Sequence, residues 1–144
     1  MTQSLNGKCL CGAVTFSAVP KKMKMGVCHC SMCRRWSGGT FMAVECGESV
    51  QFNDGAPLGR YRGSAWGERI FCQECGSTIL WQMQNGQHQN VSAQAFDDPS
   101  VFAFTSQIFI DRKPANYEFA NETKMLTEAE VMAMYAPPSE GDAA

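Results

Sequence analysis

The stretch Cys28-His29-Cys30-Ser31-Met32-Cys33 places three thiols within six residues. Cysteines that only fill a hydrophobic core pack like other small apolar side chains and carry no requirement for such close spacing. Zinc does carry this requirement, because it binds soft thiolates in a tetrahedron and a Cys-x-x-Cys turn supplies two of them from one loop. The stretch therefore predicts a metal site with at least three cysteine ligands.

The number of ligands decides what such a site can do. A structural zinc site normally has four protein ligands, whereas a catalytic site has three and leaves the fourth position to water or substrate. His29 or Cys46 could complete the three thiols, and the cysteine pairs could also combine differently. Three ligands alone favour an enzyme, and a fourth protein ligand favours a non-catalytic, zinc-stabilised binding module.

Four further cysteines flank this stretch, namely Cys9, Cys11, Cys72 and Cys75. We interpret Gly7–Phe16 as one strand whose two thiols face the same side, with Gly12 allowing the backbone to bend beside the second. The sequence at 72–76 has the spacing of a metal-binding turn whose backbone amides point at the sulfurs. Together the four thiols predict a closed site that joins distant segments and stabilises the fold.

Composition sets the broad class of protein. With 144 residues and 44% hydrophobic residues, the chain is expected to form one globular domain over 1–136, followed by a flexible tail at 137–144. The net charge of -2 and pI near 5.6 give no reason to expect nucleic acid or an acidic membrane as a partner. No export signal or transmembrane stretch is seen, so we expect a cytoplasmic protein in which paired cysteines bind metal, although eight cysteines would also suit a secreted disulfide scaffold.

The remaining pattern predicts a mainly β fold. Runs rich in aromatic and β-branched residues predict strands at 40–46, 68–71, 78–83, 89–93 and 107–111. Asn85-Gly86 predicts a hairpin, and 34–39 predicts a short helical turn that ends in glycines. Thr127-Glu128-Ala129-Glu130 has the form of a capping box and predicts one short C-terminal helix that ends before Pro137.

Three cysteine motifs occur in an order and spacing that resemble one family. They are Gly-Lys-Cys-Leu-Cys-Gly at 7–12, Cys-His-Cys-Ser-Met-Cys-Arg-Arg at 28–35 and Glu-Arg-Ile-Phe-Cys-Gln-Glu-Cys-Gly-Ser at 68–77. Segments at 95–99, 108–114 and 126–130 look like later parts of the same family. The chain is thus similar to the glutathione-dependent formaldehyde-activating (GFA) family, which is related to centromere protein V.

The resemblance implies a fold, two metal ions and a reaction. The fold is Mss4-like, with zinc-pinned antiparallel sheets and a short C-terminal helix. A structural zinc is assigned to Cys9, Cys11, Cys72 and Cys75, and a second, more labile zinc to Cys28, Cys30 and Cys33. The implied reaction is the addition of glutathione to formaldehyde, a carbon–sulfur lyase reaction run in reverse, so the implied partners are a small thiol and an aldehyde.

The chemistry of three thiolates fits such a reaction. With zinc they carry a formal charge of about -1, so the centre would activate water poorly but could take up a soft substrate thiolate. Arg34 could pair with a substrate carboxylate and Ser64 could donate a hydrogen bond, although surface charge and a turn role explain them more simply. The sequence departs from the family at Gly63 and Gln107, where ligand contacts could differ. A thiol-dependent enzyme that acts on another electrophile is a further alternative.

Overall fold

The computed structural model describes residues 3–135, and its contacts divide them into two compact units. The first unit contains the chain up to Met25 together with Met42–Ala103, and the second contains Gly26–Phe41 and the chain from Phe104 onward. The tail predicted at 137–144 lies outside the described residues, and the prediction of a single domain stays a prediction. Within the described range, no helix is long and apolar enough to cross a membrane.

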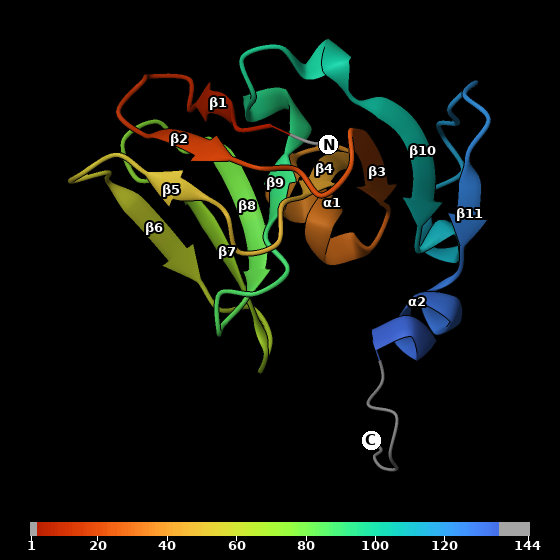
Figure 1. Cartoon of the computed structure of the whole chain (residues 1–144). Helices are drawn as coiled ribbons and strands as arrows, with labels where there is room; N and C mark the ends of the chain where they lie inside the picture. Colours follow the sequence, from red (N-terminus) through yellow and green to blue (C-terminus); the bar gives the residue numbers. More distant parts are fainter. Residues whose placement is uncertain (1–2, 136–144) are drawn as a thin grey trace. The chain divides into compact units, whose positions relative to one another are not determined.

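A small antiparallel sheet of the first unit has the strand order β1-β2-β5 (Figure 1). Its strands are β1 (Leu5–Lys8), β2 (Thr15–Ala18) and β5 (Gln51–Phe52). The prediction of one strand over Gly7–Phe16 is therefore wrong. Gly12 takes φ 84°, where a side chain would be strained, and the chain reverses there so that Cys9 N–H donates to Val14 C=O at 3.0 Å. The first two cysteines consequently lie on a turn between two strands.

The larger sheet of the first unit continues with the antiparallel order β4-β9-β8-β7-β6. Its strands are β4 (Phe41–Glu45), β6 (Leu58–Tyr61), β7 (Gly67–Cys72), β8 (Thr78–Met83) and β9 (Asn90–Ser92). The predicted hairpin is confirmed, because β8 and β9 pair and Gly86 N–H donates to Met83 C=O at 2.8 Å in the turn between them. The short 3₁₀ helices η1 (Ala93–Ala95) and η2 (Pro99–Val101) follow β9.

Side chains from both sheets form the core of the first unit. Phe16 of the small sheet and Val14, which precedes β2, belong to the same buried cluster as Ile70 and Leu80 of the larger sheet. Phe96 packs edge-on against Phe16, with ring centroids 5.3 Å apart. Burial of each large apolar side chain contributes about 1.5–3 kcal/mol. Two cysteines of the first thiol group, Cys9 and Cys72, are members of this cluster, so the group lies at the edge of the hydrophobic core.

A buried carboxylate is held within the larger sheet. Glu68 is 2% exposed and accepts hydrogen bonds from Arg60 at 2.8 Å, Arg62 at 3.2 Å and Gln82 at 2.6 Å. Gln82 in turn accepts from Gln89 at 3.0 Å. Burial raises the pKa of Glu68, but Gln82 and the two guanidinium groups outweigh it and hold the pKa below its ordinary value. The network therefore stabilises the ionised carboxylate.

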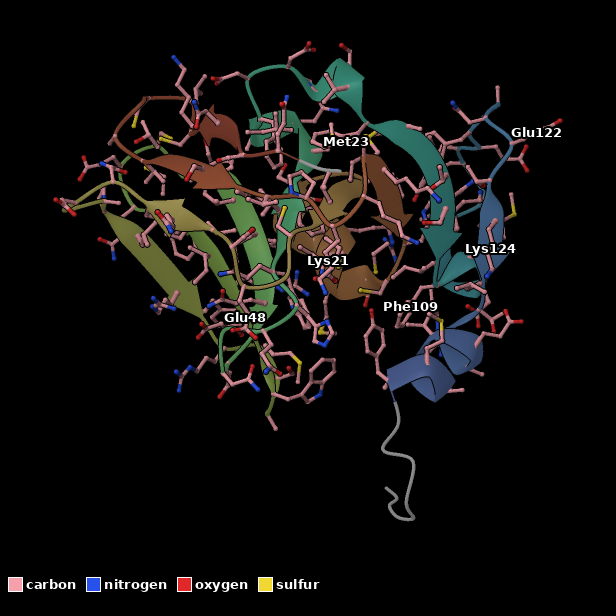
Figure 2. The ribbon with its side chains drawn as sticks, in the orientation of Figure 1. Lys21, Met23, Glu48, Phe109, Glu122 and Lys124 are labelled. Carbon is pink, nitrogen blue, oxygen red and sulfur yellow. The ribbon has the colours of Figure 1, made fainter. Side chains whose placement is uncertain are left out.

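The second unit contains a sheet with the order β11-β10-β3. Its elements are β3 (Lys24–Cys28), α1 (Ser31–Ser37), β10 (Ala103–Ile108), η3 (Ile110–Arg112), β11 (Lys124–Leu126) and α2 (Glu128–Tyr135). β10 and β11 pair in parallel, an arrangement that the expectation of antiparallel sheets did not include. A parallel pair needs a long connection, which residues 109–123 supply. Glu122 and Lys124 are exposed at the start of the edge strand β11 (Figure 2), and such charges protect an open edge from pairing with other chains.

The mainly β class and the short C-terminal helix are confirmed. Thr127 and Glu130 form the predicted capping box: Thr127 N–H donates to Glu130 Oε1 at 2.8 Å, and Glu130 N–H donates to Thr127 Oγ1 at 3.2 Å. The predicted turn at 34–39 is the second half of α1, which ends where Gly38 adopts φ 76°. Both helices of the second unit thus begin or end on signals that are local in sequence.

Candidate metal centres

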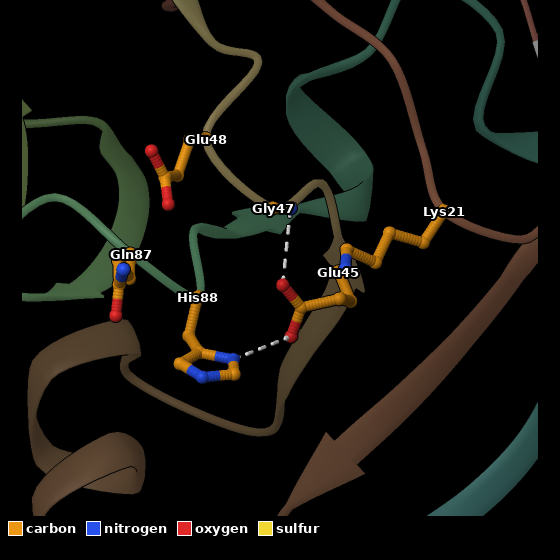
Figure 3. A pocket seen from close by; sticks show the side chains of 6 residues that line it. All are labelled: Lys21, Glu45, Gly47, Glu48, Gln87 and His88. Carbon is orange, nitrogen blue, oxygen red and sulfur yellow. Dashed lines mark hydrogen bonds and ion pairs between the residues drawn. The ribbon is translucent and has the colours of Figure 1, made fainter.

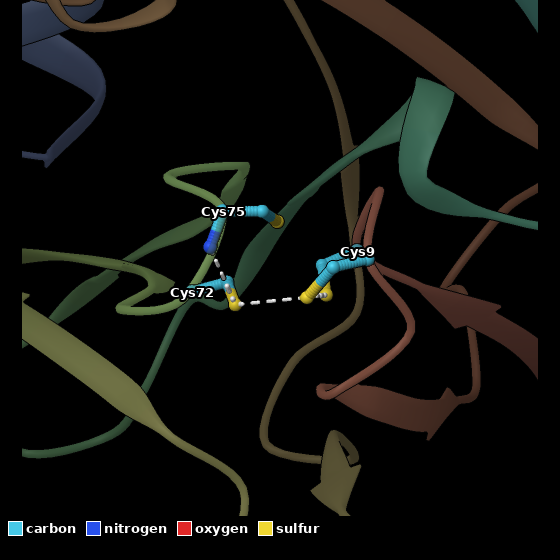
Figure 4. A group of neighbouring side chains, drawn as sticks. Cys9, Cys72 and Cys75 are labelled. Atoms are coloured by element: carbon cyan, nitrogen blue, oxygen red, sulfur yellow. Dashed lines mark hydrogen bonds between the residues drawn. The ribbon is translucent and has the colours of Figure 1, made fainter.

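The first thiol group lies between two turns of the first unit (Figure 4). Its members are Cys9, Cys11, Cys72 and Cys75, whose Sγ atoms all lie within 4.8 Å of one another. Cys9 Sγ is 3.6 Å from Cys11 Sγ, which is 3.9 Å from Cys72 Sγ. A zinc tetrahedron with Zn–S bonds of about 2.3 Å has S···S edges of about 3.8 Å. The chemistry and spacing of these four sulfurs therefore fit a zinc ion.

Backbone amides surround the sulfurs of this group. Val14 N–H donates to Cys9 Sγ at 3.3 Å, and the amides of Glu74 and Cys75 donate to Cys72 Sγ at 3.3 and 3.5 Å. This confirms the prediction that the amides of the 72–76 turn point at a sulfur. Such donors favour the thiolate, which is the form that binds metal.

Two thiols of this group, Cys75 and Cys11, have pKa values that are shifted in opposite directions. The Ser77 hydroxyl and the Ser77 amide lower the pKa of Cys75 to about 5. The pKa of Cys11 is raised to about 12, because burial and the neighbouring cysteines outweigh the backbone amide of Ala13, which lowers it. Closely spaced thiolates repel one another, so one of them keeps its proton. A divalent cation would relieve the same repulsion, as expected for a metal site.

The second thiol group lies at the junction of β3 and α1 in the second unit. Cys28 ends the strand, Cys30 is the N-cap of the helix and Cys33 belongs to its first turn, and their Sγ atoms lie within 4.8 Å of one another. Cys33 N–H donates to Cys30 Sγ at 3.3 Å, so this sulfur takes the capping role that serine or aspartate often plays. Three soft donors on one short segment also fit a zinc ion.

Protonation is again unequal in the second group. Hydrogen bonds from Cys28, Cys33 and the backbone amides lower the pKa of Cys30 despite its burial. The pKa of Cys28 is raised, first by its contacts with Cys30 and Cys33 and then by burial. The contacts within the group thus favour the thiolate at Cys30 and the protonated thiol at Cys28.

Neither proposed fourth ligand joins the second group. His29 is completely buried, and its two ring nitrogens bind Tyr117 Oη and Gln107 Oε1, each at 2.8 Å. Cys46 belongs to the first unit, where burial and Glu45 raise its pKa to about 12. Among residues 3–135, the group that could hold an ion contains only Cys28, Cys30 and Cys33 as His, Cys, Asp or Glu ligands.

The candidate substrate residues have different surroundings. Arg34 is half-buried on α1 and donates from Nε to His29 C=O at 2.9 Å, and no ion pair with a carboxylate of the described chain is found. Ser64 lies in the first unit, where its Oγ accepts from Gly67 N–H at 3.0 Å, as expected of a turn serine. Gln107 is 1% exposed, so this departure from the family pattern acts through His29 rather than on the surface.

Sequence reasoning missed two residues beside His29. Tyr117 contacts it across 88 residues, and Lys113 Nζ lies 4.9 Å from the centroid of the Tyr117 ring. Lys113 is fixed by the backbone carbonyls of Pro114 and Tyr117. Burial raises the pKa of Tyr117, whereas the positive charge of Arg34 acts in the opposite direction. No local pattern signals these contacts, because they are made by the irregular connection at 113–123.

A separate hollow of about 440 Å³ lies in the first unit (Figure 3). It is lined by Lys21, Glu45, Gly47, Glu48, Gln87 and His88. Glu45 Oε2 accepts from Gly47 N–H at 3.0 Å, and Glu45 Oε1 lies 3.7 Å from His88 Nδ1. None of the eight cysteines lines the hollow, so it belongs to neither candidate metal site.

Known proteins match both the sequence and the fold. The family profile described as glutathione-dependent formaldehyde-activating enzyme matches residues 4–112. An uncharacterised lyase of Schizosaccharomyces pombe is 38% identical over 127 residues, which are 88% of this chain and 93% of that protein. A Halomonas elongata protein, provisionally named glutathione-dependent formaldehyde-activating enzyme, is 33% identical over 86 residues, 54% of each chain.

The crystal structure of a Rhodobacter sphaeroides protein supports the fold, with a TM-score of 0.58 over 70% of this chain and all of that one, at 22% identity. The order of cysteine motifs predicted the same relationship, and their geometry here fits it. Because the profile covers most of the chain, the protein belongs to the glutathione-dependent formaldehyde-activating (GFA) family.

Proposed function

We propose that this protein is a zinc-dependent carbon–sulfur lyase of the GFA type. It adds a thiol such as glutathione to formaldehyde or a related aldehyde, or cleaves the adduct. One observation carries the proposal: within the described residues the second thiol group has three ligands, and His29 is turned away by its own hydrogen bonds. A centre with three protein ligands has a position left for a substrate.

Two zinc ions are part of this proposal. Cys9, Cys11, Cys72 and Cys75 would hold a structural ion, and Cys28, Cys30 and Cys33 would hold a second, more labile one. When bound at the second group, zinc supplies a soft Lewis-acid position that lowers the pKa of a substrate thiol. All eight cysteines are free of disulfides, which fits a reducing compartment, and we place the activity in the cytoplasm.

The reaction itself is an addition that needs no oxidant. The thiol sulfur attacks the aldehyde carbon and forms a C–S bond, the π electron pair of the carbonyl moves to oxygen, and the thiol proton ends on that oxygen. The reverse reaction breaks the same bond and returns the proton to sulfur. The protein's task is to hold sulfur and carbon together, which is catalysis by proximity and orientation.

Positive charge beside the second group favours an anionic thiol. Arg34 and Lys113 are both fixed by backbone carbonyls and have no ion pair with a carboxylate of the described chain. The guanidinium of Arg34 therefore keeps donors for a substrate carboxylate, such as the two of glutathione. Ser64 stays a weaker candidate, because its hydroxyl already serves the turn before β7.

Exchange NMR with carbon-13 formaldehyde and glutathione tests this function on the zinc-loaded protein. We expect Cys30→Ser to reduce the catalysed rate at least about a hundredfold and native mass spectrometry to show one zinc ion instead of two. Cys46→Ala is the matched control, because this buried cysteine lies outside both groups, and it should retain both ions and the rate.

Unchanged turnover in Cys30→Ser would refute the proposed role of the second group. Two bound ions that are indifferent to glutathione, without turnover of formaldehyde, would instead identify a non-catalytic, zinc-stabilised binding module. Turnover with other thiol and aldehyde pairs, but not with formaldehyde, would keep the lyase and change its substrate.

A further inference from the structure

A chain of four polar side chains runs through the second unit beside the second thiol group. Tyr117 Oη lies 2.8 Å from His29 Nδ1, His29 Nε2 lies 2.8 Å from Gln107 Oε1, and Gln107 Nε2 donates to Thr123 Oγ1 at 2.9 Å. His29 and Gln107 are fully buried, with exposures of 0% and 1%. Buried polar groups of this kind are costly unless every member is satisfied, and these are.

The orientation of the Gln107 amide, with Oε1 toward the His29 ring, sets the direction of the chain. Its Oε1 can only accept, so His29 Nε2 must carry a proton, and Nδ1 of the neutral ring is then an acceptor. Tyr117 must therefore donate its hydroxyl proton to Nδ1. The ring is completely buried and neither of its two partners is a carboxylate, so the uncharged ring is the favoured form.

The backbone of His29 is fixed as firmly as its ring. His29 N–H donates to Ile108 C=O at 3.1 Å, and His29 C=O accepts from Arg34 Nε at 2.9 Å. All four polar groups of the residue are thus held by other parts of the second unit. Cys28 and Cys30 are its direct neighbours in the chain, so the hydrogen bonds of His29 also fix the segment that carries two of the three thiols.

We propose that Gln107 is a positioning residue for the second thiol group: it locks His29 as the Nε2–H tautomer, fixes the Cys28–Cys30 segment and turns the Tyr117 hydroxyl proton inward. Residues outside the ligand shell that orient it typically change metal affinity 10- to 100-fold when replaced. The inference deepens the proposed function, because it rests on the second group being the metal site.

In the alternative arrangement, the donors and acceptors of the hydrogen bonds made by the His29 ring are exchanged. If the Gln107 amide were rotated, its Nε2 would donate to the ring, His29 Nδ1–H would donate to Tyr117, and the tyrosine hydroxyl proton would point away from His29. The two arrangements share every heavy-atom distance but place the ring proton on different nitrogens. Nitrogen-15 NMR of the histidine ring distinguishes them, because protonated and unprotonated ring nitrogens have different chemical shifts.

The experiment uses the zinc-loaded full chain labelled with nitrogen-15 and measures two quantities, the His29 ring signature and the affinity of the second zinc in competition with a chelator. We expect the wild type to show Nε2–H. Gln107→Met removes the acceptor, so the proton should move to Nδ1 and the affinity of the second zinc should fall about tenfold, with the first ion unaffected.

Gln82→Met is the matched control, because Gln82 is also a buried amide in a hydrogen-bonded chain but belongs to the first unit. It should leave the His29 signature and the second zinc unchanged. Should Gln107→Met fail to fold, Thr123→Val gives the same test more gently, since it removes only the partner that orients the amide and should yield a mixture of tautomers.

Nδ1–H in the wild type, or unchanged zinc affinity in a Gln107→Met protein that has changed tautomer, would overturn the inference. Neither measurement requires turnover. A protein that shows both expected effects but does not react with formaldehyde would retain the inference and lose the proposed lyase activity. Turnover of formaldehyde together with an unchanged affinity of the second zinc in Gln107→Met would retain the proposed lyase activity and refute the inference.

Discussion

The two thiol groups differ in how much of the chain each one joins. The first takes its members from turns that are 61 residues apart, between Cys11 and Cys72, and two of its thiols are part of the hydrophobic core. The second takes all three thiols from six consecutive residues at one strand–helix junction. Metal at the first group therefore closes a large loop, whereas metal at the second changes no long-range connection. We infer that the first group serves folding and the second can exchange ligands without unfolding the protein.

The largest effect expected from this difference concerns loss of a thiol in the first group. Cys72→Ser should remove a metal contribution on the order of 10 kcal/mol and leave the first unit unfolded at room temperature. Cys46→Ala removes an equally buried thiol of the same unit and should cost only about 1 kcal/mol. Urea denaturation followed by circular dichroism measures both. A cooperative transition with both ions retained in Cys72→Ser would mean that the first group is not a folding site.

Chelator titration should separate the two ions. The second should leave at a chelator concentration about a hundredfold lower than the first, because three protein ligands bind less tightly than four. Formaldehyde turnover should disappear as the ion of the second group leaves, while the circular dichroism spectrum stays native. Native mass spectrometry during the titration gives the count. Loss of both ions in one step together with the fold would remove the distinction between the groups.

A stability difference that depends on pH is expected from Glu68 of the first unit. Glu68→Gln should cost on the order of 2 kcal/mol, because it breaks charge-assisted hydrogen bonds to a buried carboxylate. Since the pKa of Glu68 is lowered in the folded state, this stabilisation is present above about pH 4.3 and is lost as pH falls through the lowered value. Denaturation of both proteins at pH 7 and near pH 3 tests this, with exposed Glu48→Gln as the control. An equal difference at the two pH values would contradict the assignment.

The smallest effect concerns the helix α2 of the second unit. Thr127→Ala removes one side of the capping box and should destabilise the protein by about 1 kcal/mol. Thr127→Ser keeps the hydroxyl and should restore most of the loss. Thermal melting measures both variants, and zinc content should be unchanged in each. A drop in the affinity of the second ion in Thr127→Ala would show that the helix, and not only the His29 chain, supports the thiol group.

Features that depend only on residues close together in the sequence were predicted correctly. The capping box at Thr127, the hairpin at Gly86 and the thiol spacing at Cys28–Cys33 each depend on residues a few positions apart, so the pattern contains the whole interaction. The strand expected over Gly7–Phe16 was wrong for the complementary reason. Alternating side chains suit a strand, but Gly12 also permits a reversal of the chain. In the structure the chain reverses there, and Cys9 and Cys11 lie close to the distant turn that carries Cys72 and Cys75.

Long-range contacts could not be predicted. Gln107 was recognised only as a departure from a family pattern, and its partner His29 was considered only as an alternative fourth ligand of the second group. The hydrogen bond between them spans 78 residues, and the one from His29 to Tyr117 spans 88. Tyr117 lies in an irregular connection with no periodicity, so its role depends on the packing of the second unit and leaves no signal in neighbouring residues.

The remaining thiol, Cys46, can serve as an internal probe of unfolding. It is 1% exposed and its pKa is raised to about 12, so an alkylating reagent at neutral pH meets neither an accessible sulfur nor a thiolate. It becomes reactive only when the first unit opens. The rate at which one additional mass increment accumulates on Cys46 therefore reports the opening of that unit directly.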